Sequence, residues 1–122
     1  MLINFEDERP IFVQIAEGIE DAVLAGAFLE ESQIPSTTEI SVSYKINPAT
    51  ALKGINLLVD SGILFKKRGV GMFVAPGSTK KLIEKRRNLF YENYITRLID
   101  EAKRLGIAQT EITAMIERGY RQ

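Results

Sequence analysis

The chain has 122 residues, 45% of them hydrophobic, and 16 Lys and Arg side chains balance 16 Asp and Glu side chains. This length fits one domain or a small domain with an appendage, and the hydrophobic share fits a folded protein. The absence of Cys and His excludes a disulfide framework, the usual zinc, haem and copper sites and a Ser-His-Asp triad. We therefore expect no metal and no other cofactor, and we do not expect an enzyme.

The zero net charge hides a gradient along the chain. Residues 1–44 contain one basic and nine acidic side chains, which gives a net charge of −8. Residues 45–87 contain ten basic and two acidic side chains, a net charge of +8, and residues 88–122 contain five of each. A basic block is typical of a nucleic-acid-binding surface and equally typical of a solvated surface, so charge alone leaves both open.

Two further absences bear on the cellular location. No run of 18 apolar residues occurs, so we expect no transmembrane helix and no membrane partner. The acidic amino terminus lacks the basic region and apolar core of a signal peptide. Together these features predict a cytoplasmic protein.

The first predicted element is a helix that begins at Pro10, because the missing N–H of proline is unpaired at the first helical position anyway. We expect the helix to end near Gly26, and residues 27–35 to form a connector. The apolar residues of this helix recur at every fourth position, Ile11, Ile15, Ile19 and Val23, and form one face.

Two more helices follow at short range. Ser36 and Glu39 have the spacing of a capping box, which predicts a short helix that ends near Tyr44. After Lys45 and Ile46, Asn47 and Pro48 are typical of a new helix start. The apolar face of this second helix is Ala51, Ile55, Leu58 and Val59, and Gly62 is expected to end it.

A hairpin and a helical tail complete the chain. Residues 63–67 and 72–75 are predicted strands joined by a turn with two glycines, and residues 76–78 mark a boundary. A long helix over residues 78–105 and a short one ending near residue 117 follow. This tail is too small to bury its own apolar stripe, so it needs the rest of the chain or a second copy.

The predicted fold is mainly α with a small β-hairpin. Two helices joined by a tight turn and followed by a hairpin form a winged helix-turn-helix, which binds DNA with its second helix in the major groove. We predict this domain over residues 1–76 and a helical dimerisation tail over residues 77–122. The candidate DNA-binding residues are Ser36, Thr37, Thr38, Asn47, Ala49, Thr50, Lys53, Lys66, Lys67, Arg68, Gly69 and Val70.

By their order and spacing, five segments resemble motifs of the GntR family of bacterial transcription regulators. Two of them, beginning at Asn47 and Glu101, are similar to motifs of its YtrA-like branch. The five segments are Pro10–Ile15, Pro35–Ile40, Asn47–Thr50, Lys67–Val74 and Glu101–Ile107.

This resemblance implies a homodimeric DNA-binding regulator, usually a repressor, that recognises a pseudo-palindromic operator. In the branch it implies control of an ABC transporter operon, and it names no effector. We assign dimerisation to the apolar residues Leu82, Leu89, Phe90, Leu98, Ile99, Leu105, Met115 and Ile116.

Two positions depart from the family pattern. Thr38 and Leu52 stand where the family usually has arginines that contact DNA. The departures leave a second hypothesis open, a winged-helix interaction module that has lost DNA reading. Simpler interpretations also stay open elsewhere, because Asn47 serves as a helix cap in any case, and the cations between residues 80 and 87 are favoured as a solvated face.

Overall fold

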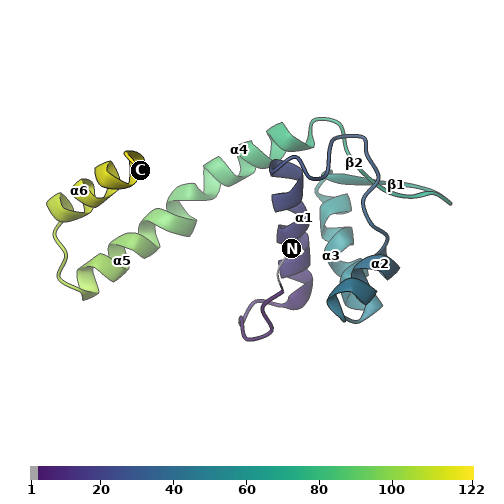
Figure 1. Ribbon diagram of the computed structural model, residues 1–122, viewed down its shortest axis with the longest axis horizontal. Helices are drawn as coiled ribbons and strands as arrows, with labels where there is room; N and C mark the ends of the chain where they lie inside the picture. The colour runs from purple at the N-terminus through teal and green to yellow at the C-terminus, as the bar shows by residue number, and fades with distance from the viewer. Residues whose placement is uncertain (1–2) are drawn as a thin grey trace. The chain divides into compact units, whose positions relative to one another are not determined.

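The computed structural model describes residues 3–122, so the first two residues of the predicted 1–76 domain lie outside it. The mainly α class with a small antiparallel hairpin is confirmed (Figure 1). The elements are α1 (Ile11–Leu24), α2 (Thr37–Tyr44), α3 (Pro48–Asp60), β1 (Leu64–Lys67), β2 (Gly71–Val74), α4 (Ser78–Phe90), the π-helical segment η1 (Tyr91–Ile95), α5 (Thr96–Arg104) and α6 (Gln109–Tyr120). In residues 3–122, no helix is long and apolar enough to cross a membrane.

The chain forms two compact units, the first ending at Glu84 and the second spanning residues 85–122. The division falls within α4, after the predicted functional boundary at residues 76 and 77. That functional boundary stays a prediction, and each unit is described by itself below.

The helix starts of the first unit follow from local chemistry. Pro10 has a ψ of 146°, outside the helical region, so α1 begins one residue later than predicted, at Ile11. The capping box of α2 is confirmed, because the Glu39 N–H donates to Ser36 Oγ at 3.0 Å and the Ser36 N–H donates to Glu39 Oε1 at 3.2 Å. Asn47 caps α3 by accepting the Ala49 N–H at 2.8 Å.

The turn between α2 and α3 is tight because Lys45 adopts a left-handed conformation with φ 55°. This residue ends α2, and Asn47 begins α3 two residues later. The left-handed region is uncommon for a residue with a side chain, and it allows the chain to reverse within a few residues. The predicted helix-turn-helix is therefore present.

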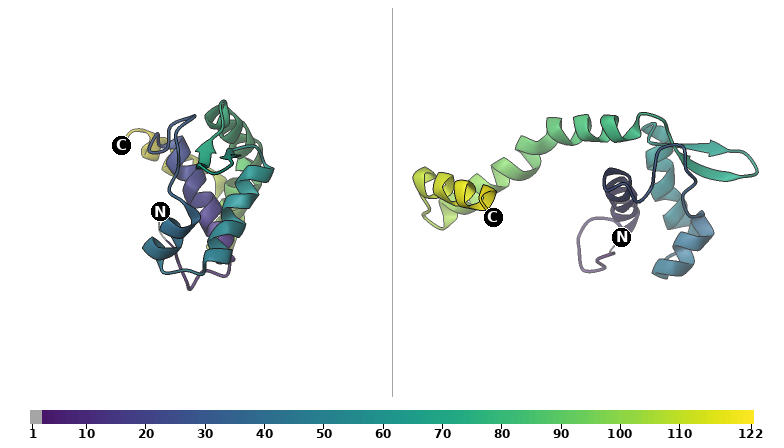
Figure 2. Two further views of the ribbon diagram at one scale, coloured as in Figure 1. Left: turned by 90° about the vertical axis from the view of Figure 1, so that its right-hand side faces the viewer. Right: turned by 45° about the horizontal axis from the view of Figure 1, so that its top comes forward.

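The core of the first unit lies between α1 and α3, and α3 also packs against α2 (Figure 2). The predicted apolar faces supply it, with Ile15, Ile19 and Val23 from α1 facing Ala51, Ile55 and Leu58 from α3. Side chains from the connector, α2, the hairpin and the start of α4 close it, namely Ile34, Ile40, Ile63, Leu64, Val74 and Leu82.

The helices α1 and α3 approach each other closely at residue 54. A Cβ atom at Gly54 would lie 2.7 Å from the carbonyl oxygen of Phe12 and 3.0 Å from Ile15 Cβ. The two backbones therefore meet without room for a methyl group. This contact fixes how α3 is rotated on α1, and so which of its faces is exposed.

The hairpin is antiparallel, with Phe65 opposite Phe73 and Lys67 opposite Gly71. The predicted connector also contributes to this sheet, since Gln33 forms a bridge with Phe73 and the Ile34 N–H donates to the Met72 carbonyl at 3.0 Å. Residues 30–33 are all polar, so no strand was predicted there and this strand-like segment was missed.

The second unit differs from the sequence prediction in two details. The helix predicted over residues 78–105 is interrupted by η1, where the Thr96 hydroxyl donates to the Glu92 carbonyl at 2.6 Å. The last helix extends to Tyr120 rather than residue 117. Ala102 is buried, but every residue that the structure describes in α6 is at least partly exposed.

Substitution of Gly54 tests the contact between α1 and α3. We expect Gly54→Ala to lower the free energy of unfolding of the first unit by about 1–2 kcal/mol, because overpacking outweighs the helix propensity of alanine. Urea unfolding measures this change. Gly119→Ala is the control, since a Cβ there meets no atom within 4 Å; an equal stability of the two variants would contradict the close contact.

Candidate nucleic-acid interface

One face of α3 is exposed and the opposite face is buried. Residues at helical spacing i, i+3, i+4 and i+7 share a side of the helix, and the exposed set is Ala49, Leu52, Lys53 and Asn56. Ala51, Gly54, Ile55 and Leu58 form the buried face. Of the sequence-predicted contacts, Asn47, Ala49 and Lys53 are exposed and Thr50 is partly exposed.

The position of Lys53 was not foreseen from the sequence. Its Nζ lies 4.1 Å from the centroid of the Phe12 ring of α1. An ammonium group over an aromatic face is attracted by the ring quadrupole. Lys53 is the basic residue of α3, so the charge of this helix is drawn towards α1.

The amino-terminal turn of α2 offers a second set of polar groups. Ser36 and Thr38 are exposed and Thr37 is partly exposed. The Ser36 hydroxyl is already engaged with the Glu39 N–H. The first N–H groups of a helix have no intrahelical partner and favour an anion, so the backbone of Thr37 and Thr38 suits a phosphate oxygen better than the Ser36 side chain does.

The wing, defined as Lys66–Val70, is the basic hairpin tip, and it extends beyond α1, α2 and α3 (Figure 1). Its residues are all exposed, and the Val70 N–H donates to the Lys67 carbonyl at 2.9 Å to close the turn. Gly69 has a φ of +78°, which glycine adopts without strain. The turn therefore leaves the side chain of Val70 60% exposed at the tip.

The cations of the wing point in different directions. Lys67 Nζ lies 4.3 Å from the Phe73 ring centroid, and Phe73 stacks on Phe65 with a centroid distance of 5.8 Å. Because successive strand residues point to opposite faces, Lys66 lies on the other face of the hairpin. The wing is therefore basic on both faces, with an aromatic pair beneath Lys67.

Gln33 was missed as a support of the wing. Its Nε2 donates to the Val70 carbonyl at 3.0 Å, and it lies where a Cβ on Gly71 would come within 2.5 Å. Gly71 has a φ of +147°, so both space and conformation favour glycine there. No local pattern could reveal a contact between residues 37 positions apart.

Glu30 links the same connector to the start of α4. Its carboxylate accepts the Gly77 N–H at 2.5 Å and the Thr79 N–H at 3.4 Å. The Gly77 N–H lowers the pKa of the Glu30 carboxyl, and the Thr79 side chain adds to this effect. The positive end of the helix dipole also stabilises a carboxylate at the amino-terminal end of a helix.

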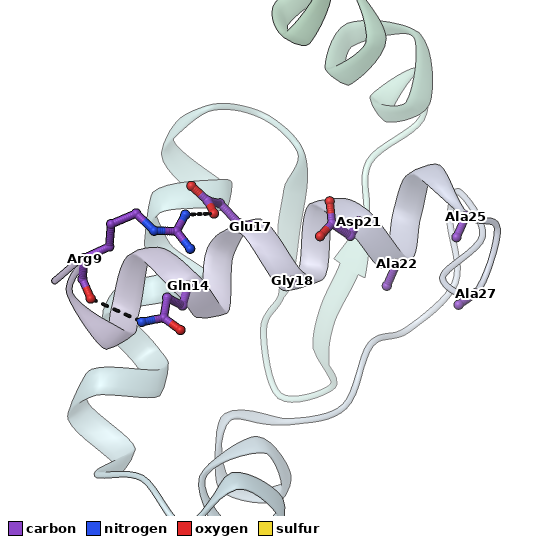
Figure 3. Close-up of a pocket in the computed structure, with 8 residues that line it drawn as sticks. All are labelled: Arg9, Gln14, Glu17, Gly18, Asp21, Ala22, Ala25 and Ala27. Atoms are coloured by element: carbon purple, nitrogen blue, oxygen red, sulfur yellow. Dashed lines mark hydrogen bonds and ion pairs between the residues drawn. The ribbon is translucent and has the colours of Figure 1, made fainter. Parts of the chain in front are cut away.

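A hollow of about 500 Å³ is lined by residues of α1 and of the segments that flank it, and none of the predicted DNA contacts is among them (Figure 3). Arg9 forms an ion pair with Glu17 at its edge, and Gln14 donates to the Arg9 carbonyl at 3.2 Å. The two carboxylates among its lining residues disfavour a phosphate. The lining residues are Arg9, Gln14, Glu17, Gly18, Asp21, Ala22, Ala25 and Ala27.

The structure corrects one residue of the predicted dimer surface. Leu82 is completely buried in the core of the first unit, so it has no surface left for a partner. The other seven predicted residues each expose more than a third of their surface, namely Leu89, Phe90, Leu98, Ile99, Leu105, Met115 and Ile116.

The model of the family described as "Bacterial regulatory proteins, gntR family" matches residues 12–74 of this chain. These residues include both helices of the helix-turn-helix and the hairpin. The chain belongs to the gntR family. Members of this family are transcription regulators and not enzymes, so the chain is a DNA-binding regulator with a winged helix-turn-helix.

Three proteins illustrate the relationship of this gntR-family chain to known regulators. The HTH-type transcriptional repressor YtrA of Bacillus subtilis (strain 168) is 26% identical over 105 residues, which cover 86% of this chain and 80% of YtrA. A GntR-family regulator structure from Bacteroides thetaiotaomicron has a TM-score of 0.70 and 32% identity, covering 91% of this chain and 96% of that chain. AraR(DBD) in complex with operator ORX1 has a TM-score of 0.55 and 29% identity, covering 62% and 90%.

The capping box of α2 yields a stability prediction. We expect Ser36→Ala to lower the free energy of unfolding by about 1 kcal/mol, because the Glu39 N–H loses its acceptor. Thermal unfolding followed by circular dichroism measures the loss. Thr38→Ala changes an exposed residue of the same turn and is the control; if both variants lose the same stability, the cap does not hold α2.

Proposed function

We propose that this gntR-family protein is a homodimeric repressor of the YtrA-like branch that binds a pseudo-palindromic operator. The observation that carries the proposal is the pairing, within one compact unit, of an exposed α3 face with a basic wing. A helix of this kind enters the major groove, while the wing reaches the adjacent backbone or minor groove. The operator complex of AraR(DBD), a structural relative, supports the same use of the domain.

The proposed DNA contacts divide by chemistry. Asn47, Ala49 and Thr50 lie at the start of α3, where a recognition helix approaches base edges. Phosphate contacts come from Lys53, from the first turn of α2 at residues 36–38 and from the wing. Phosphate contacts dominate affinity and release counterions, so binding is expected to fall steeply as salt rises.

The proposed dimer rests on the apolar surface of the second unit. Seven large apolar residues of this unit are exposed, between Leu89 and Ile116, while Ala102 is buried. So many exposed large apolar residues on a small unit favour an interaction site. A second copy covers the same surface by two-fold symmetry, and this symmetry pairs two winged domains with the two half-sites of an operator.

The biological setting follows from the relatives. The YtrA relative is named a transcriptional repressor, which supports repression here, and the YtrA-like resemblance favours an ABC transporter operon as the target. A regulator of chromosomal genes in a bacterium acts in the cytoplasm.

A second function is favoured by a specific observation. Thr38 and Leu52 stand at positions of family arginines, and Lys53 is drawn towards Phe12. These features weaken the charge of the helix-turn-helix and favour an interaction module without DNA reading. The two functions differ in whether the wing cations are needed.

Charge reversal of the wing separates the two functions. Fluorescence anisotropy with a duplex from the upstream region of the gene is expected to show binding that weakens about 10³-fold or more between 50 and 200 mM salt. Lys67→Glu with Arg68→Glu is expected to weaken binding by about 100-fold or more, since two phosphate contacts become repulsive in each protomer. Arg118→Glu with Arg121→Glu is the control of equal charge change. Absence of duplex binding by the wild-type protein would favour the interaction module. Wild-type affinity in the wing variant would place the phosphate contacts elsewhere on the protein.

The dimer has a test of its own. We expect Leu98→Glu with Ile99→Glu to convert the dimer to a monomer in sedimentation velocity, because two charges would be buried without partners. Lys103→Glu, an exposed position of the same helix, is expected to leave the dimer intact. A dimer that survives the double change would place the interface elsewhere.

A further inference from the structure

The groove-facing side of α3 has an unusual chemistry for a DNA reader. Between residues 48 and 56 this side exposes Ala49, Leu52, Lys53 and Asn56, so two of these four residues are apolar and one is an amide. Leu52 is 42% exposed, although leucine on a folded domain gains free energy from burial. The bases that such a face can recognise differ from those that a basic face recognises.

The cation of this face is directed away from the bases. The close approach of Gly54 to the Phe12 carbonyl brings α1 beside the second turn of α3. Lys53, the preceding residue, therefore places its Nζ over the Phe12 ring at 4.1 Å. No arginine occurs between residues 36 and 60, and the common reader of guanine is an arginine or lysine that contacts O6 and N7.

The side chains of Asn47 and Asn56 differ in which hydrogen-bonding groups remain available to a base. Asn47 Oδ1 already accepts the Ala49 N–H at 2.8 Å, so one of its two lone pairs is engaged and the amide is held against the start of α3. Recognition of adenine by asparagine needs both the acceptor and the donor of the amide. Asn56 lies on the exposed face, one turn beyond Leu52, and its side chain is available for both bonds.

We infer that α3 reads A·T base pairs, with Ala49 and Leu52 against thymine C5-methyl groups and Asn56 paired with adenine. Thymine is the base that presents a methyl group in the major groove, and an apolar side chain recognises it by removing that methyl from water. Leu52 thereby becomes a specificity-determining residue. The wing contacts the backbone or the minor groove, so the inference concerns only the base pairs that face α3.

This inference rests on the proposed function, because it requires the protein to bind DNA. The full-length chain is used to select binding sites from a duplex library with random positions. The affinity is then measured for the selected site, for the same site with thymine replaced by uracil, and for a site with G·C pairs in the positions that face α3. Uracil lacks only the C5-methyl group.

We expect the selected sites to contain A·T-rich half-sites. The affinity is expected to fall about fourfold for each thymine methyl group removed beside Leu52. Leu52→Ala is expected to lose affinity for the thymine site and to respond less than the wild type to uracil. Leu57→Ala is the matched control, because Leu57 exposes 41% of its surface against 42% for Leu52 and lies on another side of α3. It is expected to keep the full response to uracil.

The outcomes separate the inference from the function on which it rests. Selection of G·C pairs opposite α3, or equal affinity for thymine and uracil sites, overturns the inference and leaves the DNA-binding function standing. An equal loss of the uracil response in Leu52→Ala and Leu57→Ala also overturns it. Wild-type protein that selects no sequence overturns the proposed function as well.

Discussion

The contact between Gly54 and the Phe12 carbonyl is the constraint on which the reading surface depends. Because residue 54 has no side chain, α3 lies close enough to α1 that a Cβ atom would come within 2.7 Å of that oxygen. This closeness sets the rotation of α3, which buries Ala51 and Ile55 and exposes Ala49, Leu52 and Asn56. It also places Phe12 beneath Lys53, so core packing and surface electrostatics share one origin.

The wing depends on contacts that are distant in the chain. A two-stranded hairpin is marginal by itself, and here the connector adds a bridge from Gln33 to Phe73. Gln33 also holds the Val70 carbonyl at the tip, while Glu30 of the same connector accepts the Gly77 N–H at the start of α4. The connector therefore supports both the tip of the hairpin and the exit from it.

The two units differ in how far their large apolar side chains are buried. The first unit buries Ile15, Ile19, Ile55 and Leu58 between α1 and α3, and Leu82 of α4 also lies in that core. The second unit leaves Phe90, Leu98 and Ile99 exposed. The net charge of zero is equally a sum of opposite parts, with an acidic α1 region and a basic segment from residue 45 to residue 87. Averages over this chain therefore conceal its organisation.

The sequence by itself determined the starts of α2 and α3, the order of the elements and the family, because caps, turns and apolar repeats are local. Ser36, Asn47 and Gly62 act within three or four residues, so their roles were predictable. The tertiary structure decided what depends on distant partners: the burial of Leu82, the support of the wing by Gln33 and the place of Lys53 over Phe12. Such contacts join residues tens of positions apart, and their geometry arises only when helices pack.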